Sequence, residues 1–437
     1  MSKESVRAFL KEKQILADDI DLHEGLAQFE AELVAGLRGE ESSLLMIPTY
    51  ISVTERIPVG EPVIVMDAGG TNFRVALLTF NDFLEPVIED FQVYSMPGSQ
   101  GEMSKEEFFD TMVDYLQPVL DKSKKIGFCF SYAVEIQPNR DGRILNFSKE
   151  VRVPEVIGEL LVVNLRQALA KRNLPNDHNI VVLNDTVAAL LGGRAGAPSR
   201  VYDANIGFIL GTGTNTAYTE PATEITKIKD TLDDDQLRQK MIINTESGGY
   251  NQPAASPLDD ALDATTADPG AYRHEKMISG RYQGTQALYM IRAALDESNL
   301  FSDFFRESFR RLRDLDSRDL DDFLYEPYGA SLLSQCCAND EDRENLYYIL
   351  DNLFERAARL VAINLAAVFR RTKGGTNPVR PIAVTADGTT FYKSKLFRPK
   401  LDYYMRTFIN EELGIYSTFR KVENANLIGA GIAGLTN

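Results

Sequence analysis

The order of apolar and polar positions predicts an α/β chain. Short apolar runs typical of buried strands recur through the first half of the sequence, at 62–67, 73–80, about 86–95, 125–130 and 180–183. Residues 1 to about 45 show irregular apolar faces that favour helices. Ser104 and Glu107 have the spacing of a capping box and open a helix that continues to Leu116.

A second helix is expected to begin at Pro154, because proline suits the first helical position. Its predicted buried stripe is Ile157, Leu160, Leu161, Leu165 and Leu169. The strand at 180–183 then leads into Asn184-Asp185-Thr186 and a helix of small residues. This order of strands and helices forms one α/β unit, and Gly192–Ser199 has the composition of its boundary.

The second half of the chain begins a similar unit with a strand at 206–210. The segments 220–240 and 252–272 are polar and acidic, and we expect them to be surface insertions. Helices are expected from Glu275 to Arg371, including a long one over Glu341–Arg371. A last strand is predicted at 381–385.

Two glycine-threonine turns follow directly after apolar strands. The first is Asp67-Ala68-Gly69-Gly70-Thr71-Asn72-Phe73-Arg74, and the second is Gly211-Thr212-Gly213-Thr214-Asn215. Glycines after a buried strand allow a tight turn whose backbone N–H groups can bind an anion, and threonine hydroxyls add donors. Ordinary hairpins are the alternative, since glycine after a strand is common. Two such copies favour two related half-sites that hold one nucleotide polyphosphate.

Composition limits the classes of function. The chain has 437 residues, of which 44% are hydrophobic and 25% charged, as in an ordinary globular protein of two domains. The net charge of −17 argues against nucleic acid or an anionic membrane as the main partner. No stretch has the length of a membrane span.

The cysteine and histidine content points away from disulfides and histidine-built metal sites. Cys129, Cys336 and Cys337 form neither a disulfide framework nor a zinc spacing, which favours a reducing cytoplasm. The three histidines are not paired at ligand spacing. Gly429-Ala430-Gly431-Ile432-Ala433-Gly434 matches a dinucleotide fingerprint, but the chain ends too soon for the required second strand. We expect a loop there whose small residues permit close backbone approach.

Asn184-Asp185-Thr186 lies at the carboxyl end of a predicted strand, where α/β sheets place ligands and catalytic groups. A carboxylate at this position could accept a proton from a substrate hydroxyl. The same three residue types are preferred helix caps, and taken alone the motif favours a cap. Further polar side chains end other elements: Ser131, Asn146–Lys149, Asn244–Glu246 and Glu275. Together they supply the donors and acceptors that a polyhydroxyl ligand such as a sugar requires.

From Asp67 to Gly434 these motifs resemble, in the same order, those of the hexokinases, ATP-dependent sugar kinases of the actin-like ATPase fold. Asp67–Arg74 resembles the first phosphate motif and Gly211–Asn215 the second. Asn184-Asp185-Thr186 is similar to the motif of the catalytic base, and Asp387-Gly388-Thr389 to the loop on the adenosine side. Phe130-Ser131, Asn146–Lys149, Asn244–Glu246 and Glu275–Gly280 resemble the sugar-binding segments.

The resemblance implies a role for each matching residue. Asp185 would be the general base. The sugar would be held by Ser131, Ser148, Lys149, Asn184, Asn215, Glu246 and Glu275. ATP would be bound by Asp67, Gly69, Gly70, Thr71, Asn72, Arg74, Thr212, Gly213, Thr214, Gly388, Thr389 and Gly429, with Arg74 adding charge or bracing its loop. Asp67 and Asp185 would position Mg²⁺ through water.

The implied fold is a two-domain actin-like ATPase (ribonuclease-H-like) α/β fold with a cleft between the domains. The small domain would comprise 58–196 and the tail 425–437, and the large domain 197–424 with the helices of 1–57. The implied activity is transfer of the ATP γ-phosphoryl group to the 6-hydroxyl of a hexose, with glucose expected, in a cytoplasmic, bacterial-type, single-unit enzyme of glycolysis. A monomer or homodimer is expected. The alternative is a sugar-sensing or scaffold protein with weak catalysis on the same fold.

Overall fold

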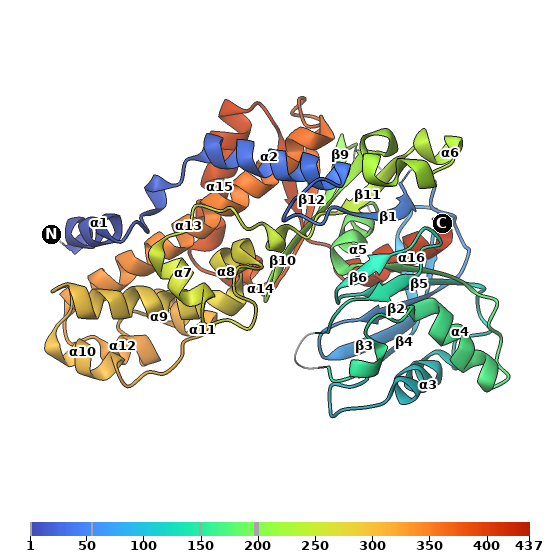
Figure 1. The fold of residues 1–437 in the computed structure, drawn as a ribbon, viewed down its shortest axis with the longest axis horizontal. Helices are drawn as coiled ribbons and strands as arrows, with labels where there is room; N and C mark the ends of the chain where they lie inside the picture. The colour runs from blue at the N-terminus through green and yellow to red at the C-terminus, as the bar shows by residue number, and fades with distance from the viewer. Residues whose placement is uncertain (1, 54–55, 148–150, 196–200) are drawn as a thin grey trace.

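The chain folds into two lobes, each built on one larger sheet (Figure 1). This computed structural model describes residues 2–53, 56–147, 151–195 and 201–437. The five-stranded sheet has the order β4-β3-β2-β5-β8, and the six-stranded sheet has the order β1-β11-β10-β9-β12-β13. In the five-stranded sheet, β4, β3 and β2 pair antiparallel, and β5 and β8 then continue parallel to β2. In the six-stranded sheet, β11, β10 and β9 pair antiparallel in the same way, and β12 and β13 continue parallel to β9. The chain therefore repeats one sheet topology.

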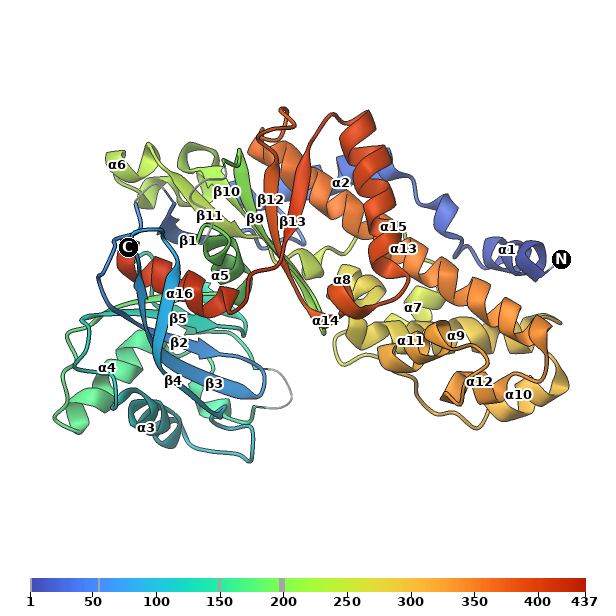
Figure 2. The same ribbon diagram turned by 180° about the vertical axis from the view of Figure 1, so that it is seen from behind.

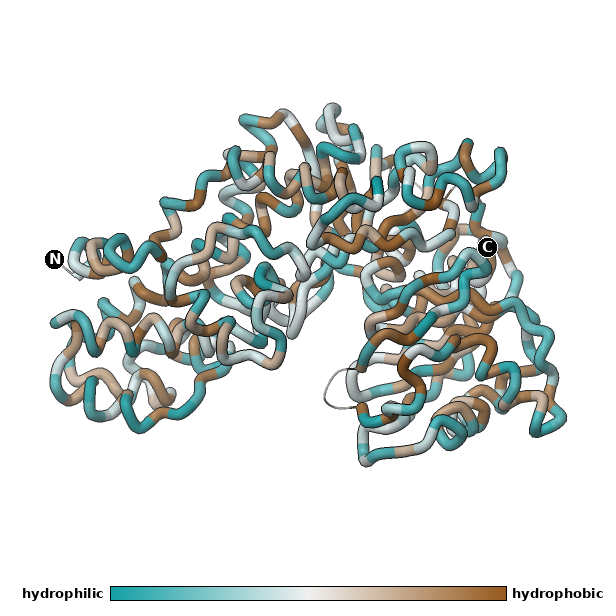
Figure 3. Tube along the Cα trace, viewed as in Figure 1, coloured by the Kyte–Doolittle hydropathy of each residue, from teal (hydrophilic) through white to brown (hydrophobic). Residues whose placement is uncertain are grey.

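The strands β2, β5 and β8 of the five-stranded sheet are buried on both faces, whereas its edge strand β4 is mostly exposed. Its strands are β2 (Val63–Ala68), β3 (Asn72–Phe80), β4 (Pro86–Ser95), β5 (Lys125–Phe130) and β8 (Asn179–Leu183). Along β2, Ile64 and Met66 belong to one core and Val63 and Val65 to another, so successive side chains are buried on opposite faces. Apolar segments run along these strands while polar ones gather in the loops (Figure 3).

Two helices cover the outer face of this sheet. They are α3 (Lys105–Leu116), which begins with the predicted capping box at Ser104 and Glu107, and α4 (Leu161–Lys171). The prediction of a helix starting at Pro154 is wrong: Pro154–Val156 forms one 3₁₀ turn, and Ile157 is exposed. The physical reason lies upstream, because the carboxylate of Asp141 accepts hydrogen bonds from the backbone N–H groups of residues 162 and 163 and so fixes the start of α4.

That capping carboxylate lies in the turn of a small hairpin, directly before its second strand. The strands are β6 (Val134–Ile136) and β7 (Gly142–Ile144), and neither was predicted from the sequence. The two strands pair from Val134–Ile144 to Ile136–Gly142, and the backbone of Ile144 also bonds residues 158 and 159. Such short strands carry too few residues for a periodic apolar signal.

Two buried helices, α5 (Asp185–Gly192) and α16 (Ala425–Thr436), lie between the two sheets (Figure 2). Helix α16 packs against β2 and β5, and α5 packs against α16 and β9. Glycine makes these contacts possible, because a Cβ at Gly429 would lie 1.9 Å from the Ala188 carbonyl oxygen and one at Gly207 would lie 2.0 Å from that of Thr186. The predicted close backbone approach occurs at 429–434, but the expectation of a loop there is wrong.

The six-stranded sheet forms the second lobe together with most of the helices. Its strands are β1 (Ile47–Ser52), β9 (Ala204–Leu210), β10 (Thr214–Pro221), β11 (Lys240–Asn244), β12 (Ile382–Asp387) and β13 (Ser417–Arg420). The predicted long helix is α13 (Asp340–Thr372), whose side chains between 345 and 369 are mostly buried. Helices α1 (Ser2–Glu12) and α2 (Leu22–Arg38) pack against it.

Shorter helices complete this lobe: α6 (Asp234–Leu237), α7 (Pro257–Asp263), α8 (Arg273–Ile278), α9 (Gly280–Glu297), α10 (Asp303–Phe309), α11 (Ser317–Tyr325), α12 (Leu332–Cys336), α14 (Thr389–Lys393), α15 (Phe397–Tyr404) and a π-helical turn at Met405–Glu412. Single 3₁₀ segments lie at Ala17–Asp19, Ala222–Glu224, Thr226–Thr231 and Ser247–Gly249. Among the described residues, no helix combines the length and apolar character needed to cross a membrane. The cysteines are buried and unpaired.

Candidate active site

The first glycine-threonine turn connects β2 to β3 in the five-stranded lobe. Asp67 is buried near the end of β2, and its Oδ2 accepts a 2.6 Å hydrogen bond from Arg74 on β3. The hydroxyl of Tyr132 donates to the carbonyl oxygens of Gly69 and Gly70 at 2.8 and 3.2 Å. These contacts fix the turn from below, and within the turn the Gly69 N–H donates to the Asn72 carbonyl oxygen at 3.0 Å.

The second turn connects β9 to β10 in the six-stranded lobe and lies against the third loop. The carbonyl oxygen of Gly211 accepts from the backbone N–H of Gly280 at 2.9 Å and from the hydroxyl of Thr390 at 3.0 Å. Gly388 has a φ of +113°, and a Cβ there would lie 2.1 Å from the Leu210 carbonyl oxygen. Only glycine fits this position, so the second turn and the loop at 387–389 form one continuous backbone surface.

An amide and carboxylate cluster lies beside the second turn. The Nδ2 of Asn215 donates to Asn244 Oδ1 at 2.7 Å, to Glu246 Oε1 at 3.2 Å and to Asn184 Oδ1 at 3.5 Å. Asn244 Nδ2 donates to the same Glu246 oxygen at 2.7 Å. Three chain segments therefore meet at the Asn215 amide, and Glu246 itself has the left-handed φ of +54°. A non-glycine residue in this region is uncommon and is found at functional sites.

A second carboxylate, Glu275, joins this cluster from helix α8. Its Oε2 accepts a 3.0 Å hydrogen bond from the backbone N–H of Thr214. A Cβ at Gly213 would lie 2.6 Å from that oxygen, so the small residue makes room for Glu275 against the turn. The second glycine turn thus contacts both the loop at 388 and the acidic side chain at 275.

Asp185 occupies the first position of α5, directly after the N-cap residue Asn184. The backbone N–H of Thr186 donates to Asn184 Oδ1 at 2.9 Å and to Asp185 Oδ1 at 2.7 Å. The motif is therefore a helix cap, as one interpretation predicted. The cap also fixes the direction of Asp185, whose second carboxylate oxygen takes no part in this contact.

The electrostatics of the site are set by buried carboxylates. Part of Asp185 borders solvent, but protein surrounds its carboxylate, and this desolvation with the nearby charges of Glu246 and Asp67 raises its pKa to about 6. Burial likewise raises the pKa of Asp67, although Arg74 opposes the change. Burial, reinforced by Glu275, raises the pKa of Glu246. A carboxylate that titrates near neutrality suits general-base chemistry.

The Asp67 carboxylate is suited to hold a divalent cation through water molecules or phosphate oxygens. The Oδ1 atom of Asp67 is buried with no hydrogen-bond partner in the described part of the chain. An unpartnered buried carboxylate oxygen is a suitable outer ligand for Mg²⁺, which usually keeps several waters and contacts few protein groups. Among the described residues, no group of three or more His, Cys, Asp or Glu side chains could hold a metal ion.

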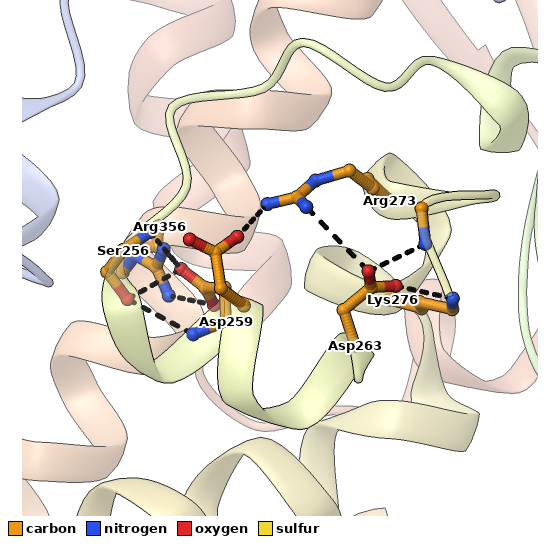
Figure 4. Close-up of polar contacts among 8 residues, drawn as sticks. Ser256, Asp259, Asp263, Arg273, Lys276 and Arg356 are labelled. Atoms are coloured by element: carbon orange, nitrogen blue, oxygen red, sulfur yellow. Dashed lines mark hydrogen bonds and ion pairs between the residues drawn. The ribbon is translucent and has the colours of Figure 1, made fainter. Parts of the chain in front are cut away.

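A buried ion-pair network holds α8, and therefore Glu275, in place (Figure 4). Lys276 Nζ lies 2.6 Å from Asp263 Oδ1 on α7, and both side chains are largely buried. Arg356 on α13 pairs with Asp259 on α7 at 2.6 Å. Burial alone would raise the pKa of Asp259, but the Arg356 guanidinium keeps it below its ordinary value. The network thus links α8 through α7 to the long helix of the lobe.

Lys276→Met is expected to lower the free energy of unfolding by about 3 kcal/mol, because it leaves the Asp263 carboxylate without its closest cation. Equilibrium denaturation in urea measures this change. Arg310→Met is the matched control, since its ion pair with Asp296 is exposed and contributes little. If both variants lost the same stability, the network would not be what holds α8.

The structure brings most of the predicted residues together at the junction of the two lobes. Asn184, Asp185, Asn215, Glu246 and Glu275 are linked by the contacts above. Ser131 follows β5, and its N–H donates to the Ala68 carbonyl oxygen at 3.0 Å beside the first turn. Thr71, Asn72 and Thr212 are exposed at the two turns, and Thr389 is exposed next to Gly388.

Of the predicted residues that the structure describes, Gly429 does not join this cluster. Gly429 is buried inside α16, where its contact is the backbone of Ala188. Ser148 and Lys149 lie outside the described residues. Conversely, within the predicted segment Asn244–Glu246 only Glu246 was given a role, although Asn244 bonds both Asn215 and Glu246. Its position two residues before Glu246 at the end of a buried strand was the available signal.

The repeated sheets, the two helices between them and the paired glycine turns define an α/β protein of the actin-like ATPase fold. The solved structure of a hexokinase from Schistosoma mansoni complexed with glucose has this fold, with a TM-score of 0.77, 23% identity and coverage of 100% of both chains. A second solved structure, of a hexokinase, gives a TM-score of 0.68 at 21% identity over 99% of this chain and 96% of that one.

Two family models described as hexokinase match residues 7–195 and 205–436, and the chain therefore belongs to the hexokinase family. Hexokinase-3 of Mus musculus is 28% identical over 389 residues, which is 84% of this chain and 40% of that protein. Hexokinase-5 of Oryza sativa subsp. japonica is 27% identical over 435 residues, 92% of this chain and 83% of that protein. The chain thus spans less than half of the mouse protein but most of the rice one.

Proposed function

We propose that this chain is an ATP-dependent hexokinase that transfers the γ-phosphoryl group to the 6-hydroxyl of a hexose, with glucose the expected substrate. The observation that carries the proposal is Asp185, a carboxylate fixed at the start of α5 with its pKa raised to about 6, beside the Asn215–Glu246 cluster of the other lobe. Membership of the hexokinase family supports the same assignment.

The sugar is held by paired amides and carboxylates. An ionised carboxylate only accepts hydrogen bonds, whereas an amide both donates and accepts. Glu246 and Asn215 together can therefore hydrogen-bond two adjacent hydroxyls of the sugar. Glu275, Asn184 and Ser131 complete this set, and we assign Ser148 and Lys149 to it as well. Asn244 is a positioning residue, because its amide holds Glu246 Oε1 at 2.7 Å.

Asp185 acts as the general base in the transfer step. As the hydroxyl oxygen forms its bond to the γ-phosphorus, the hydroxyl proton passes to the Asp185 carboxylate and the bond from phosphorus to the bridging oxygen of ADP breaks. Base assistance is typically worth about 10²–10⁴-fold. Alignment and charge stabilisation supply the rest of the acceleration.

The glycine turns bind the nucleotide. The N–H groups of Gly70 and Gly213, with the hydroxyls and amides of Thr71, Asn72 and Thr212, would face the phosphates, and Gly388 and Thr389 would lie on the adenosine side. Gly69 and Thr214 would shape the two turns, because the Gly69 N–H donates to the Asn72 carbonyl oxygen and the Thr214 N–H and hydroxyl donate to Glu275 and to the Ile209 carbonyl oxygen. Asp67, with Asp185, would hold Mg²⁺ through water, and the ion supplies charge neutralisation on the phosphates. We omit Gly429 from this set, because its backbone is covered by α5.

We further propose that the lobes act as two domains that close on the sugar. The small domain comprises 58–196 with 425–437, and the large domain 197–424 with 1–57. This division is supported by β1, which belongs to the six-stranded sheet, and by α16, which packs on the five-stranded one. Closure would suppress ATP hydrolysis by water. The three unpaired cysteines support a cytoplasmic location, and we expect a monomer or homodimer.

The proposal is tested by ADP release from Mg·ATP with glucose, mannose, fructose and glucosamine, beside a control without sugar. We expect release that depends on glucose and a ranking of the other hexoses below it. Glucose binding in calorimetry without ADP release would instead support the sugar-sensing or scaffold alternative.

A further inference from the structure

A buried polar side chain connects the long helix α13 to the proposed sugar site. Asn364 lies among the apolar residues of α13 between 360 and 369, and it is fully buried. Its Nδ2 donates to the Thr216 hydroxyl on β10 at 3.0 Å. Its Oδ1 has no hydrogen-bond partner in the described part of the chain. A buried amide with one unpaired oxygen lowers stability, so the packing of the core gives no reason for an asparagine here.

The Thr216 hydroxyl belongs to a buried pair that lies behind the Asn215 amide. It is 3.2 Å from the Ser247 hydroxyl, and both side chains are fully buried. The backbone N–H groups of the same two residues donate to Asn215 Oδ1, at 2.7 Å from Thr216 and 3.4 Å from Ser247. Asn364 is therefore bonded to the hydroxyl pair of the two residues whose N–H groups hold the Asn215 oxygen.

These two N–H groups decide which end of the Asn215 amide faces the sugar site. With Oδ1 held by them, Nδ2 is directed at Asn244 and Glu246. The opposite orientation would bring Oδ1 against the Glu246 carboxylate and Nδ2 against two N–H donors, and both contacts are repulsive. A sugar hydroxyl that lies between Asn215 and Glu246 requires one donor and one acceptor, so the orientation of this amide matters for binding.

We propose that Asn364 is a positioning residue for sugar binding, which keeps Nδ2 of Asn215 directed at the sugar by holding the hydroxyl pair of Thr216 and Ser247. This role rests on the proposed function, in which the Asn215 amide binds the sugar. The second glycine turn is held separately, because the Thr214 N–H and hydroxyl donate to Glu275 and to the Ile209 carbonyl oxygen. The effect of Asn364 is therefore expected on the affinity for the sugar and not on the affinity for ATP.

Asn364→Leu removes the donor with little change in side-chain volume. The Thr216 hydroxyl keeps the Ser247 hydroxyl as its partner. In calorimetry on the full chain we expect the glucose Kd to rise about fivefold or more, on the scale of one hydrogen bond, and the ATP Kd to stay within about twofold. The midpoint of unfolding in urea should stay the same or rise, because the unpaired oxygen is removed as well.

Asn352→Leu is the matched control, because Asn352 is also a buried asparagine on α13 but bonds the segment before α2. Its Nδ2 donates to the Ile15 carbonyl oxygen at 2.9 Å, and its Oδ1 accepts from the Ala17 N–H at 2.8 Å. Leucine there leaves both backbone groups without this partner, so the urea midpoint should fall while the glucose Kd stays within about twofold. The variant that loses stability is then not the one that loses sugar affinity, which a purely structural role of Asn364 would not produce.

Thr216 provides a second test of the same contact. Thr216→Val keeps the shape without the hydroxyl, whereas Thr216→Ser keeps the hydroxyl without the methyl group. We expect the valine variant to bind glucose about fivefold or more weakly and the serine variant to stay within about twofold of the wild type. Adding Asn364→Leu to Thr216→Val should change the glucose Kd by less than about twofold, because both substitutions remove one hydrogen bond.

The positioning role is overturned if Asn364→Leu binds glucose like the wild type, or if Asn352→Leu loses as much affinity. If the wild type binds no glucose, the proposed function fails, and hydrogen exchange without any ligand decides the role of Asn364. Peptides covering residues 244–250 should then exchange about threefold or more faster in Asn364→Leu than in the wild type, and at the wild-type rate in Asn352→Leu. Equal exchange in the wild type and Asn364→Leu would overturn the role.

Discussion

Asp185→Asn is expected to lower kcat by about 10²–10⁴-fold while leaving the Kd of ATP within about twofold of the wild type, since a general base contributes on that scale. Asparagine keeps the oxygen that accepts from the Thr186 N–H at 2.7 Å, so the cap of α5 survives. Single-turnover kinetics with glucose and calorimetry with ATP measure the two effects.

The same variant is expected to be more stable than the wild type. Burial raises the pKa of Asp185 in the native state from 3.8 to about 6, so the native state favours the protonated carboxyl. The contribution of Asp185 to the free energy of unfolding is therefore lost as the pH rises through about 6. Removing the charge should therefore add roughly 2–3 kcal/mol to the free energy of unfolding at pH 7.5, at about 1.4 kcal/mol per pKa unit.

Asp303→Asn is the matched control. Asp303 also occupies the first position of a helix, α10, but its side chain is exposed and lies on an element that contributes nothing to the candidate site. It should change neither kcat nor stability appreciably.

The wild-type kcat/KM should rise with pH through about 6 as Asp185 ionises. Near-normal turnover in Asp185→Asn would remove this residue from the role of base.

Glu246→Gln is expected to weaken glucose binding by about 10- to 100-fold, since hydrogen bonds to a charged group contribute about 1.5–3 kcal/mol each. Glutamine retains an oxygen for the Asn244 and Asn215 amides, so the local structure should persist. The ATP Kd should stay within about twofold, because the Glu246 carboxylate bonds the side-chain amides of Asn215 and Asn244 and not the backbone of either glycine turn. Calorimetry with each ligand separates the two losses.

This variant also reports on the coupling between carboxylates. Glu246 raises the pKa of Asp185, so its neutralisation should move the midpoint of the pH–rate profile to lower pH. Glu224→Gln, at an exposed position in the same lobe, is the control and should leave both binding and midpoint unchanged. Equal losses of glucose and ATP affinity would show a structural defect instead of a lost sugar contact.

Strong local signals were sufficient to predict much of the fold from sequence. The apolar run at 125–130 is strand β5, and the pattern over 341–371 is helix α13. Ser104 and Glu107 form the predicted capping box. In each case the residues that determine the element lie inside it, so a window of the sequence contains the whole cause.

The errors arose where distant contacts decide the local structure. Helix α4 starts at Leu161 because Asp141, about twenty residues earlier, binds its first N–H groups. The glycines at 429–434 suggested a loop, yet α16 is helical because its small residues fit against α5 and β5. Packing of this kind overrides helix propensity and cannot be read from a single window.

The candidate site was predicted in outline because its residues end strands, where the sequence shows both the apolar run and the polar residue after it. The segment Asn244–Glu246 was predicted, but Asn244 received no role of its own, because its partners, Asn215 and Glu246, come together only in the folded lobe. The resemblance to hexokinases supplied the roles, and the assignment of each residue to sugar, phosphate or proton transfer remains a prediction.

The central claim is that the site phosphorylates the 6-hydroxyl of a hexose, and it is tested most directly by comparing glucose with 6-deoxyglucose in the presence of Mg·ATP. We predict that glucose yields ADP and a hexose 6-phosphate in equal amounts, identified by phosphorus NMR. 6-Deoxyglucose should bind competitively yet release no ADP above the control without sugar. Equal ADP release from both sugars, or binding of glucose without any phosphorylated product, would contradict the account.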